Sequence, residues 1–137
     1  MKKLLKIIGI ILLIVIFSTA LGWPYDVSKV RIPYLMVAGT GIADGGDGVE
    51  GSNNVGIAPL FSLNENFNAI PDDVPKVMAR EKGKDHGDML HYADGYMTAW
   101  FVYYLQENED AGNAFFGENA EILSNPNWQD VRAVNSK

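Results

Sequence analysis

The sequence contains no cysteine among its 137 residues. That absence excludes disulfide frameworks, thiolate metal centres, cysteine nucleophiles and lipid-modified cysteines. A cysteine-free chain is compatible with an oxidising exterior. The sequence also lacks internal repeats and low-complexity tracts, and its length predicts about one small domain.

Positive charge is scarce in this chain. Three of the 11 basic residues, Lys2, Lys3 and Lys6, lie at the N-terminus, which leaves 8 basic against 17 acidic residues in the remainder. A surface this acidic argues against nucleic-acid binding and against a polybasic role at a membrane surface. We therefore predict no nucleic-acid partner.

Residues 1–22 predict a signal peptide or a membrane anchor. Basic residues at the start precede an aliphatic run, and Ser18, Thr19 and Ala20 resemble a signal-peptidase site. The run is long enough for the core of a signal peptide, and residues 4–22 nearly reach the about 20 residues of an uncleaved anchor. Both alternatives predict an exported protein, either secreted or held in the membrane by an N-terminal hydrophobic helix.

Two apolar segments predict neighbouring parallel strands. The first runs from Ile32 to Gly39 and the second from Pro75 to Arg80, and neither alternates with polar residues, as is typical of strands buried on both faces. A glycine-rich loop, Gly39–Gly56, and a predicted helix, Pro59–Phe67, separate them. Strand, helix and strand in this order predict a βαβ unit.

A long apolar helix is predicted after the second strand. It runs from Met89 to Leu105, and Asp88 is a favourable N-cap residue. A helix this apolar needs burial over much of its surface, and Gly95 favours close packing against a neighbour. A further helix is predicted over Ala111–Leu123, followed by a tail from residue 127 to residue 137.

Aromatic residues recur at helical spacing between residues 92 and 104. Such a stripe is more often core packing than a ligand-binding surface, and we predict packing. The stripe consists of Tyr92, Tyr96, Trp100, Tyr103 and Tyr104.

Acidic residues follow the first predicted strand, and a histidine follows the second. Asp44 and Asp47 are the acids and His86 is the histidine. The carboxyl ends of adjacent parallel strands meet at one edge of a sheet, so these side chains are expected to meet. A carboxylate bound to one imidazole nitrogen fixes the tautomer, and the other nitrogen can take a proton from a nucleophile. The alternative is a surface-loop histidine and two turn aspartates.

Two other kinds of site involve the glycine-rich loop. Asp44, Asp47 and Glu50 suggest calcium, but their spacing does not match an EF-hand loop. A phosphate cradle would need a Gly-Lys-Ser/Thr ending or a Gly-x-Gly-x-x-Gly opening, and the loop has neither. We predict no metal and no cofactor in this loop.

A zinc site is the remaining alternative, around the histidine. His86 and His91 are flanked by Asp85 and Asp88, but the two histidines do not have the four-residue spacing that shares a helix face. We predict no metal here either.

The order of acid and histidine resembles the C-terminal portion of an α/β-hydrolase. Residues 33–44, residues 84–88 and the helical segments 96–105 and 111–116 are similar to esterases and lipases of the dienelactone hydrolase and cutinase-like branch. The resemblance covers about residues 27–125. It implies that His86 is the general base, that Asp44 is the triad acid with Asp47 as the second choice, and that an ester is the substrate of the complete enzyme.

The nucleophile of that family is not found in the sequence. An α/β-hydrolase presents its serine in Gly-x-Ser-x-Gly upstream of the acid, and no such motif occurs here. Ser28 precedes a predicted strand and Ser52 follows the acid, so neither occupies a nucleophile elbow. The sequence thus supplies a base and an orienting acid without the group that they would activate.

These observations predict an α/β fold for residues 23–137, a partial α/β-hydrolase-like sandwich of two parallel strands with about three helices. The expected function is the acid-and-histidine portion of an exported serine ester hydrolase of the carboxylesterase or lipase type. It would be inactive alone and would need a complementary chain that carries the nucleophile. The alternative is a non-catalytic, membrane-anchored interaction module that binds a partner through an exposed sheet edge.

Overall fold

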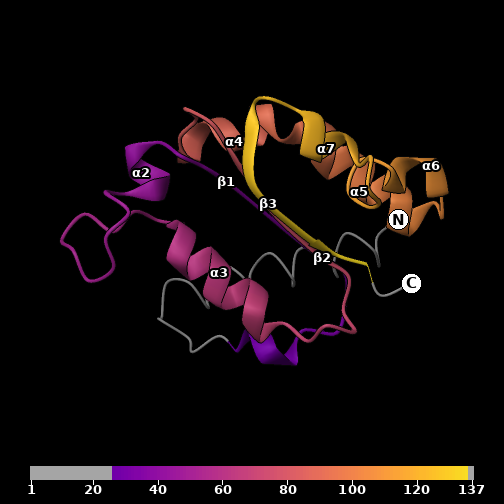
Figure 1. The fold of residues 1–137 in the computed structure, drawn as a ribbon, viewed down its shortest axis with the longest axis horizontal. Coiled ribbons are helices and arrows are strands. Elements are labelled where there is room, and N and C mark those ends of the chain that lie inside the picture. Colours follow the sequence, from indigo (N-terminus) through magenta and orange to yellow (C-terminus); the bar gives the residue numbers. More distant parts are fainter. Residues whose placement is uncertain (1–25, 136–137) are drawn as a thin grey trace, which may run out of the picture.

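A three-stranded mixed sheet lies at the centre of the protein (Figure 1). The computed structural model describes residues 26–135, so the predicted signal peptide or anchor at 1–22 lies outside the described residues. The strands follow the order β1, β2, β3, with β1 parallel to β2 and β3 antiparallel to β2. They are β1 (Tyr34–Gly39), β2 (Lys76–Glu81) and β3 (Trp128–Val134).

The predicted parallel pair is confirmed. Gly39 at the end of β1 lies opposite Glu81 at the end of β2, so both strands finish at the same edge of the sheet. Burial differs between them, because β2 is central and almost wholly buried, whereas β1 is an edge strand that is only partly buried.

The prediction of two strands and a C-terminal tail is wrong, since the tail contains β3. Trp128 is buried opposite Glu81, but the residues after it are mostly half-buried and several are polar. An edge strand of this kind has no continuous apolar run to reveal it. The pairing is irregular between Met78 and Arg80, and Asp130 has a positive φ of 54°. Arg80 holds this irregular segment, because Nε and Nη2 both donate to Asp130 Oδ2, at 2.9 and 2.7 Å.

Helices cover both faces of the sheet (Figure 1). One face carries α3 together with the short 3₁₀ helix η1, and the other carries the C-terminal helices. Two short helical segments, α2 and η2, follow the carboxyl ends of β1 and β2. The helices are η1 (Val27–Lys29), α2 (Ile42–Gly45), α3 (Leu60–Ala69), η2 (His86–Asp88), α4 (Met89–Tyr92), α5 (Asp94–Leu105), α6 (Glu109–Gly112) and α7 (Glu121–Ser124).

The structure corrects the predicted number and limits of the helices. The helix predicted from Met89 to Leu105 is divided at Ala93, which is fully buried and has φ −94° and ψ 0°. The helix predicted over Ala111–Leu123 is wrong, because the chain turns at Gly117, where φ is +94°. Residues 26–135 therefore contain six α-helices, most of them short, instead of about three.

Two apolar cores result, one on each face of the sheet. The larger core contains Val77, Ala79 and Trp128 of the sheet, Trp100 of α5, and Phe115, which follows α6. The predicted aromatic packing is confirmed for Tyr96, Trp100 and Tyr103, which are buried, and is wrong for Tyr92, which lies in α4 and is 45% exposed. Phe101 and Leu105 on the same helix are 58% and 76% exposed, so the predicted burial of much of this helix is only partial.

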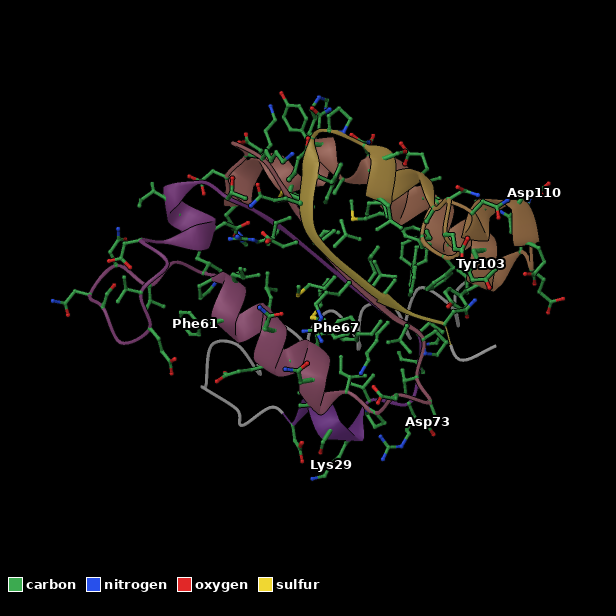
Figure 2. The ribbon with its side chains drawn as sticks, viewed as in Figure 1. Lys29, Phe61, Phe67, Asp73, Tyr103 and Asp110 are labelled. Atoms are coloured by element: carbon green, nitrogen blue, oxygen red, sulfur yellow. The ribbon has the colours of Figure 1, made fainter. Side chains whose placement is uncertain are left out.

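The second core lies between the sheet and α3. Phe67, labelled in Figure 2, is buried there with Met36, Leu63 and Met78. The fully buried Lys76 crosses this layer, and its ammonium group donates to the carbonyl oxygens of Phe67 and Ile70, at 2.8 and 2.5 Å, and to Asp72. These bonds satisfy its three donors, so this lysine has a structural role at the end of α3.

No helix within residues 26–135 combines the length and the hydropathy that crossing a membrane requires.

Candidate functional site

The carboxyl ends of β1 and β2 bring an acid and a histidine together. Asp44 lies in α2, just after β1, and His86 opens η2, just after β2. His86 Nδ1 is 2.8 Å from Asp44 Oδ1. The predicted hydrogen-bonded contact between an aspartate and His86 is therefore present in the fold, and Asp44 is the aspartate that makes it.

Asp44 is held rigidly on both of its oxygens. The carboxylate is 1% exposed, and Oδ2 accepts a 2.5 Å hydrogen bond from the backbone N–H of Gly39 while Oδ1 faces His86. A buried carboxylate is tolerated only when its oxygens have partners, and here one partner is the imidazole. This arrangement favours the tautomer with a proton on Nδ1 and leaves the lone pair on Nε2.

His86 stays accessible although Nδ1 is bound to Asp44. Its side chain is 58% exposed, and no hydrogen bond of Nε2 is found among residues 26–135. A base must reach the proton that it removes, and an exposed imidazole with Nε2 unbound is compatible with that requirement.

Asp85 fixes the loop that carries the pair. Its carboxylate accepts from the backbone N–H groups of Ala43 and Asp44 at the start of α2, at 3.2 and 2.8 Å. It also caps η2 by accepting from His86 N at 2.9 Å. These hydrogen bonds, that from Ala43 first, hold the pKa of Asp85 below its ordinary value. One carboxylate therefore ties the acid-bearing helix to the histidine-bearing helix.

The helix cap predicted for Asp88 has a different partner. Its side chain makes no cap to α4 and instead accepts from Asp85 N at 2.9 Å, which completes a capping box on η2. Asp88 thus supports the histidine loop and not the long helix.

Two glycines allow the loops after β1 and β2 to touch. A Cβ on Gly39 would lie 2.1 Å from the carbonyl oxygen of Lys84, and one on Gly41 would lie 2.6 Å from Asp85 Cγ. Gly41 also donates to Lys84 O at 2.7 Å. Close backbone approach, which only glycine permits, sets the distance between the acid and the histidine.

The second-choice acid, Asp47, does not contact His86. It lies in the exposed loop beyond α2, where its carboxylate accepts from Val49 N at 2.9 Å, and that bond lowers its pKa. Among residues 26–135, no three acidic or histidine side chains are grouped so that they could bind a metal ion. The residues considered for calcium around Glu50 and those considered for zinc around His91 form no such group.

A second cluster of polar side chains lies on the α5 face and was not predicted from the sequence. Tyr96 is hydrogen-bonded to Glu121 and accepts from Asn125 Nδ2 at 3.0 Å. Glu81 at the end of β2 is 5% exposed and lines the same pocket. One feature of the sequence could have indicated this cluster. Glu81 shares one face of β2 with Val77 and Ala79, which are buried in the core, and a carboxylate is rarely buried on such a face.

Burial alters the acidity of this cluster. Burial raises the pKa of Glu81, against a smaller attraction from Lys84. The pKa of Tyr96 is likewise raised, by burial first and then by the hydrogen bond to Glu121.

A scan against models of known protein families finds no match for the chain, and a search of curated protein sequences finds none either. The class that the structure defines is a small mixed α/β protein. Its candidate site is defined by the contact between Asp44 and His86.

Proposed function

We propose that Asp44 and His86 are the acid and the general base of a serine ester hydrolase, with the nucleophile supplied by a complementary chain. The observation that carries this proposal is the buried carboxylate of Asp44, held by Gly39 N and 2.8 Å from His86 Nδ1. Such a carboxylate orients the imidazole and stabilises the imidazolium that forms when Nε2 takes a proton.

The edge strand β1 offers the place where the complementary chain would add. Its outer side borders an apolar groove of about 300 Å³, lined by Tyr34, Leu35 and Val37 from the strand and by Met97, Trp100 and Phe101 from α5. Neighbouring strands lie about 4.8 Å apart, so a parallel strand added here would end about one strand away from Asp44. The loop that follows such a strand would lie at the same edge of the sheet as Asp44 and His86, and a serine in this loop would have to reach Nε2 across the end of β1.

Labelling with a fluorophosphonate probe tests the proposal. The purified full-length chain alone is expected to hydrolyse no p-nitrophenyl ester and to take no label, because it lacks the nucleophile. When the tagged chain is isolated together with its partner from the native source, we expect one serine of the partner to be labelled. The label should disappear with His86→Ala and with Asp44→Asn, and it should persist with Asp47→Asn, the matched control.

Two outcomes would contradict the proposal. One is stoichiometric labelling of a serine within residues 1–137 that is lost with His86→Ala. The other is a stable native complex in which no serine of the partner is labelled.

The second candidate function, a non-catalytic interaction module, is favoured by the same apolar edge. Phe101 is 58% exposed beside β1, and a large exposed aromatic residue at a groove is typical of a docking surface. In this case Phe101→Asp should abolish partner binding, and Leu105→Asp, on the same helix but outside the groove, should not. If His86→Ala removes neither binding nor any probe label, the interaction module is the better description.

A further inference from the structure

A polar and aromatic pocket lies on the face of the sheet that α5 covers, separate from the contact between Asp44 and His86. It has a volume of about 450 Å³ and is formed by the end of β2, the first turn of α5 and the segment joining α7 to β3. This volume falls within the range of about 300–1,000 Å³ that is common for small-molecule sites. The lining residues that matter here are Glu81, Tyr92, Asp94, Tyr96, Glu121 and Trp128.

Glu81 is the feature that points to a ligand. It is 5% exposed, and its Oε2 atom has no hydrogen-bond partner among the described residues. A buried carboxylate oxygen without a partner is unfavourable, and native proteins rarely keep one without a functional reason. A cation held in the pocket beside Glu81 would balance the charge of this carboxylate.

The charges around the pocket select a cation. Asp94 and Glu121 add two further carboxylates to Glu81, and no lysine, arginine or histidine is among the residues that line the pocket. Lys84 lies nearby and attracts Glu81, but its ammonium group is placed over the ring of Tyr92, 3.6 Å from the centroid. That contact shows that a ring at the rim of this pocket accepts an ammonium group.

Aromatic side chains make the rest of the wall. The rings of Tyr96 and Trp128 meet edge to face, with centroids 5.0 Å apart, and both residues are almost wholly buried. Trp128 lies opposite Glu81 in the sheet, so a carboxylate and an indole line the same end of the pocket. A carboxylate beside aromatic faces is the environment that organic ammonium ions prefer.

The same geometry argues against a metal ion. A metal needs several donors that converge on one point, and the described residues contain no group of three acidic or histidine side chains so arranged. Glu121 is also engaged by the hydroxyl of Tyr96 and by Asn125. Carboxylates spread around an aromatic cavity suit a cation with its own apolar volume.

We propose that this pocket binds a small organic ammonium ion, with the Glu81 carboxylate as its counter-ion and the rings of Tyr96 and Trp128 beside its alkyl groups. The site is independent of the proposed hydrolase function, since none of its residues contacts Asp44 or His86 through a hydrogen bond.

The test compares choline with 3,3-dimethylbutan-1-ol, which has the same shape but carries a neutral carbon in place of the ammonium nitrogen. The full-length chain is kept in a maltoside detergent, which contains no ammonium group, and binding is followed by ¹H–¹⁵N NMR. We expect saturable shifts at Glu81, Tyr96 and Trp128 below about 10 mM choline, and much weaker shifts with the alcohol.

Charge-matched variants locate the binding. Glu81→Gln removes the counter-ion and should weaken choline binding by about tenfold or more. Asp94→Asn, at an exposed position on the rim, should weaken it by about two- to threefold. Glu65→Gln removes the same charge from α3, on the other face of the sheet, and should leave the affinity unchanged. Retained folding of each variant is read from the same spectra.

The proposal is overturned by equal binding of choline and its neutral analogue, by unchanged choline affinity in a folded Glu81→Gln protein, or by absence of saturable shifts at the pocket. Displacement of choline by calcium at an equimolar concentration would also contradict it, because it would assign the pocket to a metal ion.

Discussion

At the scale of single residues, the carboxylates of Asp44 and Asp85 are fixed by hydrogen bonds. Asp44 uses both carboxylate oxygens, one on Gly39 N and one toward His86 Nδ1. Asp85 uses its carboxylate to bind three backbone N–H groups from two loops. The histidine is thus positioned by backbone geometry as much as by its partner.

Gly39 gives the first residue-scale prediction. Because a Cβ there would lie 2.1 Å from the Lys84 carbonyl oxygen, Gly39→Ala should lower the free energy of unfolding by about 2 kcal/mol. Gly87→Ala is the matched control, since a Cβ at Gly87 meets nothing within 4 Å, and it should change stability by less than about 0.5 kcal/mol. Urea denaturation of the two variants measures both values. Equal stability of the two variants would show that the loops do not approach as described.

Glu81 gives the second prediction at the scale of single residues. Burial raises its pKa in the folded protein, so the folded state holds this proton more tightly than the unfolded chain does. Stability then falls as pH rises through the raised pKa, because the ionised carboxylate is buried without a partner. Glu81→Gln keeps the shape and cannot ionise, and it should raise the free energy of unfolding at neutral pH by about 1 kcal/mol.

The pH dependence supplies the control for this substitution. The gain from Glu81→Gln should vanish in acid, below the ordinary carboxyl range, where Glu81 of the wild-type protein is also protonated. Denaturation curves recorded across this pH range measure the effect. If Glu81→Gln instead lowers the free energy of unfolding at neutral pH, the attraction of Lys84 outweighs the cost of burying the Glu81 carboxylate.

At the scale of elements, α5 differs from its sequence-based description. Close packing was predicted as the reason for Gly95, but a Cβ at this position meets nothing within 4 Å, and Gly95 lines the pocket of Glu81. No neighbouring atom requires a glycine at this position. Glycine therefore only destabilises the helix here, because it loses more conformational entropy on folding than alanine does.

Gly95→Ala is therefore predicted to stabilise the protein by about 0.5–1 kcal/mol, through a lower conformational entropy of the unfolded chain. Gly112→Ala in α6 is the comparison, because its Cβ would lie 2.8 Å from Tyr103 Cε2 and should destabilise. Thermal unfolding followed by circular dichroism gives the two melting temperatures. We expect the two melting temperatures to shift in opposite directions, and shifts in the same direction would contradict the packing described for these glycines.

The elements that were predicted well are those bounded by proline, glycine or charged residues in the sequence. Both parallel strands and the helix before β2 lie close to their predicted limits. The helix limits after residue 88 were wrong for two reasons. Ala93 is buried in the core, and an alanine gives no local sign of a break in the helix. Gly117 turns the chain with a φ of +94°, which is a local signal that the predicted helix ignored.

At the scale of the whole molecule, β3 forms one edge of the sheet, and β1 forms the other, beside an apolar groove. The contact of Asp44 with His86 could be predicted because parallel strands bring their carboxyl ends together. The preference for Asp44 over Asp47 came from the resemblance alone, because strand order does not distinguish them, and in the fold it depends on α2 turning the chain back toward Gly39. The pocket beside Glu81 could not be predicted, because its wall is formed by three segments that are distant in the sequence.

The strand β3 supports a prediction at this scale. Trp128 is buried in the larger core, and loss of a buried tryptophan costs about 3–5 kcal/mol, a large part of the about 5–15 kcal/mol that stabilises a typical domain. A chain that ends at Asn127 should therefore lose its cooperative thermal transition, which calorimetry detects. A truncated chain with an unchanged transition would show that β3 is dispensable for folding.

The central claim is that Asp44 fixes the tautomer of His86 and leaves Nε2 able to accept a proton. Long-range ¹H–¹⁵N NMR of the histidine rings at about pH 8 measures this directly, since the two ring nitrogens have distinct shifts in each tautomer. We predict that His86 carries its proton on Nδ1 in the wild-type protein and in Asp47→Asn, and that Asp44→Asn loses this preference. A wild-type His86 with its proton on Nε2, or the same spectrum in Asp44→Asn as in the wild type, would contradict the account.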